Sequence, residues 1–150
     1  MAAAANVGIS AHTDFETHTF LHQDSPGLQL WLPAGGGGGG GGWATAPLPD
    51  EGHWTCILSD MVERWTNGLA PACRHRVAFT PWPRASLIRF VGVDADTVVA
   101  PLPCFGPPRA DYPPVSQGAW LDQKMAAADA RRLASVERGI VPRSEAAGLL

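Results

Sequence analysis

The sequence has few charged residues and no marked excess of either sign. Only 17% of its 150 residues are charged, and 11 basic against 14 acidic side chains give a formal net charge of −3. This balance leaves no broad basic surface, so we expect no nucleic-acid partner. No apolar run in the sequence approaches the roughly 18 residues that a membrane-spanning helix requires. We therefore expect no membrane partner either.

Cysteine is also scarce. The three cysteines, Cys56, Cys73 and Cys104, lie far apart and form no Cys-x-x-Cys motif, which argues against a disulfide framework or a zinc knuckle. Residues 1–6 are rich in alanine and have no basic stretch followed by a long apolar one, so they do not resemble a signal peptide. We expect a cytoplasmic protein with reduced thiols.

Glycine and proline are abundant, with 17 and 14 residues. A length of 150 residues allows one domain at most, and this composition favours short strands joined by turns over a bundle of long helices. Several short segments are rich in apolar, β-branched or aromatic residues, and residues of different character alternate at 17–22 and 28–32; we predict these segments to be strands. They are residues 7–11, 17–22, 28–32, 54–58, 75–79, 85–93 and 98–102. The segments 17–22 and 28–32 flank a Ser-Pro-Gly turn, and we expect them to form an antiparallel pair.

Low-complexity and helical segments complete the predicted layout. We interpret the unbroken glycine run at 35–42 as an insertion in a hairpin loop, because glycine has no side chain to bury and a longer surface loop costs little entropy. A phosphate-binding loop is the alternative, but no Lys-Ser/Thr pair follows the run. Residues 60–65 suit one helical turn. We expect a domain of strands at 7–104, a proline-rich linker at 105–118, an amphipathic helix packed on the sheet at 119–139, and a tail at 140–150. The six prolines between positions 101 and 114 should exclude regular structure there.

A His-x-Asp motif at His12 and Asp14 is the first feature that suggests chemistry. In an extended segment, residues two positions apart project to the same side, so the imidazole and the carboxylate can reach one metal ion. A second histidine would complete the two-histidine, one-carboxylate set of non-haem iron sites. His75, at the start of a predicted strand, is the natural candidate. A histidine that hydrogen-bonds a turn carboxylate is the alternative interpretation of the motif alone.

Arg84 and Ser86 share one face of the next predicted strand. A guanidinium group beside a hydroxyl offers parallel N–H donors and an O–H donor, which suit a carboxylate. An anionic co-substrate held there by one end is then able to chelate a metal by the other. The alternative is a surface charge next to a solvated serine.

The order of these motifs resembles that of the iron(II)/2-oxoglutarate-dependent oxygenases, in their isopenicillin N synthase-like branch. The likeness extends from about Gly8 to Leu102 and rests on motifs at separate places in the chain. These are Gly8–Glu16, Thr19–Gln23, Pro26–Leu30, Ser59–Gly68, His75–Val77 and Arg84–Ser86.

The resemblance implies a fold, a chemistry and a set of site residues. The implied fold is mainly β, with a double-stranded β-helix (jelly-roll) core and a C-terminal helix. Because family members carry a further region ahead of the His-x-Asp motif, we expect the core to be incomplete at its N-terminus. The resemblance assigns His12, Asp14 and His75 to Fe(II), and Arg84 and Ser86 to the far carboxylate of 2-oxoglutarate. The implied reaction uses O2 and 2-oxoglutarate, releases succinate and CO2, and oxidises a small organic substrate.

Three alternatives stay open at this point. The chain is either a catalyst or a non-catalytic fragment that binds metal or serves as an interaction module. Some relatives, isopenicillin N synthase among them, use the Arg-x-Ser pair for their substrate and need no 2-oxoglutarate. A zinc-dependent cupin-like enzyme uses similar metal ligands, but it has no need of a carboxylate receptor such as Arg84 and Ser86.

Overall fold

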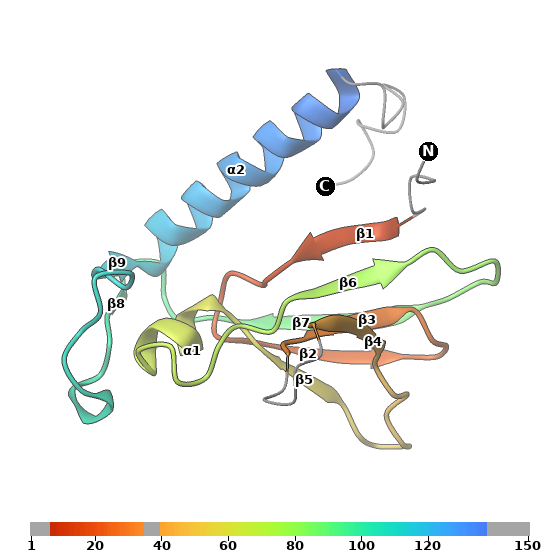
Figure 1. The fold of residues 1–150 in the computed structure, drawn as a ribbon, viewed down its shortest axis with the longest axis horizontal. Coiled ribbons are helices and arrows are strands. Elements are labelled where there is room, and N and C mark those ends of the chain that lie inside the picture. Colours follow the sequence, from red (N-terminus) through yellow and green to blue (C-terminus); the bar gives the residue numbers. More distant parts are fainter. Residues whose placement is uncertain (1–6, 35–39, 138–150) are drawn as a thin grey trace.

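Two antiparallel sheets that face each other form the body of the protein (Figure 1). The computed structural model describes residues 7–34 and 40–137. One sheet has the strand order β1-β6-β3-β4 and the other β5-β2-β7. The strands of the first sheet are β1 (Val7–His12), β6 (His75–Ala78), β3 (Leu28–Leu32) and β4 (Gly42–Thr45). Those of the second are β5 (Thr55–Leu58), β2 (His18–Gln23) and β7 (Ser86–Val91).

Successive strands alternate between the two sheets, apart from the β3–β4 hairpin. This winding is that of a double-stranded β-helix, so the predicted jelly-roll core is confirmed. The core lies between the sheets, where alternate residues of each strand point inward. Along β2 the buried positions are Thr19, Leu21 and Gln23. Leu21 packs with Leu28 of the opposite sheet and with Ile57, each at most 3% exposed.

The expected pairing of segments 17–22 and 28–32 is wrong. β2 and β3 belong to different sheets, with β2 paired to β5 and β7, and β3 paired to β4 and β6. The turn after β2 carries the chain across the core, so Leu21 and Leu28 meet face to face instead of lying on neighbouring strands. An alternating pattern shows which face of a strand is buried, but it does not show which strand lies beside it.

The β3–β4 hairpin encloses the glycine run, most of which lies outside the described residues. Leu32 pairs with Gly42 and Trp31 with Trp43, and the two indole rings meet edge to face with centroids 5.3 Å apart. The hairpin predicted around the run is therefore confirmed. The sequence did not predict β4, because the short segment Gly42–Thr45 adjoins the glycine run and is not rich in apolar β-branched residues.

The segment after β7 contains short elements and a long helix. These are β8 (Val98–Val99), the 3-10 turn η1 (Pro103–Phe105), β9 (Val115–Ser116) and α2 (Gln117–Glu137). The prediction that the prolines exclude regular structure from 101–114 is wrong at η1, because proline fits the first position of a helical turn. Asn67, after the short helix α1 (Asp60–Trp65), bonds to the carbonyls of Phe105 and Pro107 and holds this segment against the body.

The C-terminal helix is present but does not pack on the sheet as we expected. α2 begins two residues before the predicted start, and positions 138 and 139 of the predicted range lie outside the described residues. Figure 1 shows the helix running obliquely past β1. Its first turns contact the body, whereas Met125 and Leu133 are 46% and 60% exposed. An amphipathic helix packed on a sheet would bury a continuous apolar stripe, and these two apolar residues of α2 are instead exposed.

Candidate metal centre and carboxylate receptor

The two histidines predicted as metal ligands face each other across a pair of strands. His12 ends β1 and His75 begins β6, and the two are register partners. Partners on antiparallel strands project to the same face, which brings their ring centroids to 4.3 Å. The pairing slips between Ile9 and His12, and such an irregularity changes the direction of the side chain that follows it.

Asp14 completes a group of three potential ligands. Its Oδ1 lies 3.5 Å from Nε2 of His12 and 3.6 Å from Nε2 of His75. The three ligand atoms all lie within 4.8 Å of one another. Ligands at about 2.1 Å from one ion and at right angles lie about 3 Å apart, so small movements bring these atoms around a single metal ion.

Backbone and hydroxyl groups orient each of the three side chains. Nδ1 of His12 donates to the carbonyl of Ser10 at 2.8 Å, and Nδ1 of His75 donates to that of Cys73 at 3.0 Å. These bonds place the proton on Nδ1 and leave Nε2 free to coordinate. Thr19 donates its hydroxyl to Oδ2 of Asp14. Only Oδ1 therefore faces the histidines, as a monodentate ligand.

The electrostatics of the group favour a neutral His75 and an ionised Asp14, the forms in which both residues can coordinate a metal ion. Burial opposes the charge of Asp14, but hydrogen bonds from His12 and Thr19 outweigh it and hold its pKa below the usual value. Burial lowers the pKa of His75. The hydrogen bond to Asp14 instead raises the pKa of His12. At neutral pH the group thus offers an ionised carboxylate and a neutral His75, whereas a proton on His12 competes with a metal.

The structure also brings Arg84 and Ser86 together, at the start of β7. Nη1 of Arg84 lies 3.5 Å from Oγ of Ser86. Nη2 of Arg84 donates to Oε1 of Gln23 at 2.8 Å, and Ser86 is the register partner of Gln23. Nε of Arg84 is buried and has no partner among the described residues. The arrangement supplies hydrogen-bond donors in excess of the acceptors beside them.

Strand β2 connects the two groups. Its inward residue Thr19 contacts Asp14, and its inward residue Gln23 contacts Arg84. Four residues of strand separate these positions, which corresponds to roughly 13 Å of backbone. The side chain of Arg84 is long, and a five-carbon dicarboxylate bound between it and the metal-ligand candidates would cover the rest of this distance.

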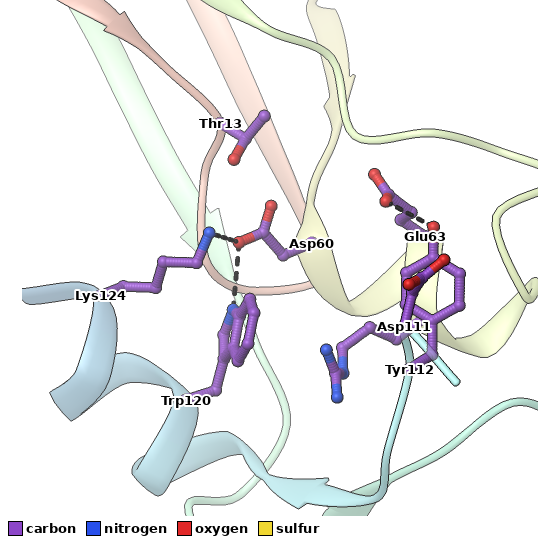
Figure 2. Close-up of a pocket in the computed structure, with 8 residues that line it drawn as sticks. Thr13, Asp60, Glu63, Asp111, Tyr112, Trp120 and Lys124 are labelled. Atoms are coloured by element: carbon purple, nitrogen blue, oxygen red, sulfur yellow. Dashed lines mark hydrogen bonds and ion pairs between the residues drawn. The ribbon is translucent and has the colours of Figure 1, made fainter. Parts of the chain in front are cut away.

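A polar cavity of about 300 Å³ lies next to this site, beside Thr13 of the His-x-Asp motif (Figure 2). Figure 2 shows Trp120 and Lys124 of α2 facing the carboxylate of Asp60, and they bond to its Oδ2 at 3.0 and 2.9 Å. The backbone N–H of Asp60 donates to the carbonyl of Asp14 at 3.0 Å. Helix α1 therefore connects α2 to the turn that carries a candidate ligand.

Several residues of the site were not predicted from the sequence. Thr19 and Gln23 lie on the buried face of a predicted strand, and a buried polar residue there was the available signal. Asp60 lay in a predicted helical turn, where an acidic residue is unremarkable. His18 and His22, by contrast, alternate with the inward residues of β2 and lie away from the metal ligands.

Comparison with known proteins connects the chain to an enzyme superfamily. Residues 3–93 match the family model described as the 2OG-Fe(II) oxygenase superfamily. A homoarginine-6-hydroxylase of Glycine max is 35% identical over 100 residues, which cover 65% of this chain and 28% of the relative. A gibberellin 2-beta-dioxygenase of Oryza sativa subsp. japonica is 34% identical over 104 residues, or 68% of this chain and 28% of the relative. The chain thus spans under a third of the length of these two relatives.

The solved structures agree with this connection. A full-length Neurospora crassa protein, solved in complex with alpha-KG and thymine, matches with a TM-score of 0.67 at 27% identity, over 81% of this chain and 38% of that protein. The dioxygenase for auxin oxidation in rice matches with a TM-score of 0.66 at 22% identity, over 82% of this chain and 42% of that protein, which shows the shared fold. In the part of this chain that the structure describes, no helix has the length and hydrophobicity needed to cross a membrane.

Proposed function

The chain belongs to the 2OG-Fe(II) oxygenase superfamily, and from this premise we propose that it carries the iron and co-substrate sites of an oxygenase that oxidises a small organic molecule. His12, Asp14 and His75 are the proposed Fe(II) ligands. Arg84 and Ser86 are the proposed receptor for the far carboxylate of 2-oxoglutarate. The observation that carries the proposal is the convergence of both Nε2 atoms on Oδ1 of Asp14.

The residues present fit an iron ion. Two imidazoles and one carboxylate on one side of the ion leave the remaining positions open for other ligands. The Nδ1 atoms and Oδ2 of Asp14 are already engaged with protein groups, so the atoms left over are the ones that a metal would need. The same donor set suits zinc, but a zinc hydrolase has no need of the donors that Arg84 presents.

The chain's own residues have distinct tasks in the proposed reaction. When bound, Fe(II) and 2-oxoglutarate supply the activation of O2 that accompanies loss of CO2 from the 2-oxo acid. His12, Asp14 and His75 hold the ion on one side. Arg84 and Ser86 bind the far carboxylate and so fix the direction of the 2-oxo end. Thr19 keeps Asp14 in place and favours its charged form.

Anaerobic titration tests this function. We expect the chain to bind Fe(II) and then 2-oxoglutarate, with a visible charge-transfer band when the 2-oxo acid chelates the ion. In air, succinate release should require Fe(II). His75→Ala should remove the band and the succinate, whereas His18→Ala, which alters a histidine on the opposite face of β2, should keep both. A folded wild-type chain that binds Fe(II) but gives neither band nor succinate contradicts the catalytic proposal.

That contradictory result would favour the second candidate, a non-catalytic metal-binding or interaction module. One observation favours it: the inward residues of β7 are not covered. Ile88 and Phe90 lie on the same face as Leu21 and Thr19 of β2, yet they are 40% and 58% exposed. An oxygenase excludes stray water from its reaction centre, so further protein would have to close this side.

Domain limits and location complete the proposal. We propose residues 7–104 as the oxygenase unit, 105–118 as its connection and 119–139 as the terminal helix. The three cysteines are free in the structure, which supports a cytoplasmic location.

A further inference from the structure

Gln23 occupies an unusual position for an uncharged polar residue. It ends β2 on the inward face and is 2% exposed. Its Oε1 accepts a hydrogen bond from Nη2 of Arg84 at 2.8 Å. Because a guanidinium group has only donors, the amide oxygen must face Arg84 and the amide nitrogen must face away from it. The orientation of the Gln23 side chain is thus determined by Arg84.

The amide nitrogen of Gln23 lacks a hydrogen-bond acceptor in the part of the chain that the structure describes. Nε2 is buried and finds no acceptor among the described residues, and the same is true of Nε of Arg84. A buried donor without a partner destabilises a protein, and two such donors in one contact are rarely kept without a reason. Both belong to the carboxylate receptor, and an anion arriving there supplies acceptors.

Gly27 leaves room for the arginine. A Cβ atom at this position would lie 2.8 Å from both Cδ and Nε of Arg84. The stem of Arg84 therefore crosses directly over the Gly27 backbone. Gln23 and Gly27 flank the turn that leads from one sheet to the other. Gln23 contacts the guanidinium group of Arg84, and the Gly27 backbone supports the side-chain stem.

We propose that Gln23 is a positioning residue for the co-substrate. Its amide oxygen fixes the Arg84 guanidinium over Gly27, so that the free edge of the guanidinium and Ser86 are aimed at the far carboxylate of the bound 2-oxo acid. This inference rests on the proposed function. It predicts that Gln23 contributes to the affinity for a dicarboxylate but not to the affinity for a 2-oxo acid that lacks the second carboxylate.

A second glutamine–arginine pair serves as a matched control. Oε1 of Gln29 on β3 accepts a hydrogen bond from Nε of Arg76 at 2.7 Å. This pair lies on the outer face of its sheet, since Gln29 alternates with the core residues Leu28 and Leu30. Gln29→Leu therefore removes the same kind of bond away from the receptor.

The experiment compares two ligands that differ only at one end. Calorimetric titration of the Mn(II)-loaded chain uses 2-oxoglutarate and 2-oxopentanoate, which has a methyl group in place of the far carboxylate. For Gln23→Leu we expect the affinity for 2-oxoglutarate to fall about tenfold to a hundredfold, as for loss of a hydrogen bond to a charged group. The affinity for 2-oxopentanoate should be unchanged, and Gln29→Leu should change neither.

Gly27→Ala provides an independent variant in case Gln23→Leu fails to fold. The new methyl group would displace the flexible stem of Arg84, so we expect the same selective loss of 2-oxoglutarate. A measurement on the unaltered chain adds a third test. The side-chain NH2 resonances of Gln23, assigned by NMR, should shift on addition of 2-oxoglutarate and stay in place with 2-oxopentanoate.

The outcomes separate this inference from the proposed function. If the wild-type chain binds 2-oxoglutarate and Gln23→Leu binds it equally well, Gln23 has no positioning role. Equal losses for both ligands would show a general structural role and also overturn the inference. If the wild-type chain binds neither 2-oxo acid, the proposed function fails, and the inference fails with it.

Discussion

The metal-ligand candidates and the proposed carboxylate receptor prepare their polar groups in opposite ways. Among the metal-ligand candidates, the side chains are oriented before any ion arrives, because backbone carbonyls engage both Nδ1 atoms and Thr19 engages Asp14. In the receptor, Nε of Arg84 and Nε2 of Gln23 are left without partners among the described residues. One region is pre-organised, whereas the other gains its missing bonds only from a ligand. Changes in the first should therefore act on the metal, and changes in the second on the co-substrate.

The largest effect is expected for Asp14→Asn. The substitution removes the anionic donor on which both histidines converge, so we expect Mn(II) affinity to fall by more than about 100-fold, above the range typical for residues that only support a ligand. Calorimetry measures this change. The exposed carboxylate of Asp50 provides a control, and Asp50→Asn should bind Mn(II) as the wild-type chain does.

Arg84→Lys separates the receptor from the metal-ligand candidates most directly. Lysine keeps the charge but loses the planar fork that bonds Gln23 and faces Ser86. We expect 2-oxoglutarate affinity to fall about tenfold to a hundredfold, with Mn(II) affinity in the absence of 2-oxoglutarate unchanged. A parallel loss of metal binding would show that the two regions are not independent.

Thr19→Val tests the support of a metal ligand without changing the ligand itself. The variant keeps the side-chain shape but removes the donor to Asp14. Metal affinity should fall about tenfold, and Thr19→Ser should restore it. The pKa of the Asp14 carboxyl should also rise, which NMR titration of the metal-free chain can follow. Unchanged affinity in Thr19→Val would mean that the histidines alone orient Asp14.

The most gradual effect is that of pH. Metal binding requires unprotonated imidazoles. Since the pKa of His12 lies above its usual 6.5, its proton should begin to compete with Mn(II) as the pH falls through that raised pKa. The lowered pKa of His75 means that this residue competes only at lower pH. Mn(II) affinity should thus weaken steadily below neutral pH, and an affinity that stays constant down to about pH 5.5 would contradict this order.

Local patterns predicted the strands better than they predicted their arrangement. Alternation placed β2 and β3 within a residue of their observed limits, because successive side chains of a strand point to opposite faces. It did not reveal that the two strands lie in opposite sheets, since that depends on how the whole chain closes around Leu21 and Leu28.

The same contrast applies to the candidate site. The proximity of His12 and Asp14 follows from their spacing in the sequence. His75 reaches them only because β6 pairs with β1, and no local pattern in the sequence determines that pairing. The contact between Gln23 and Arg84 could not be predicted, because it joins residues that are distant in sequence.

The Trp31–Trp43 pair has a practical consequence. These rings close the β3–β4 hairpin at the base of the glycine run, and extending a loop adds closure entropy only as the logarithm of its length. The run is consequently a suitable place to insert a reporter peptide or a fluorophore-binding tag.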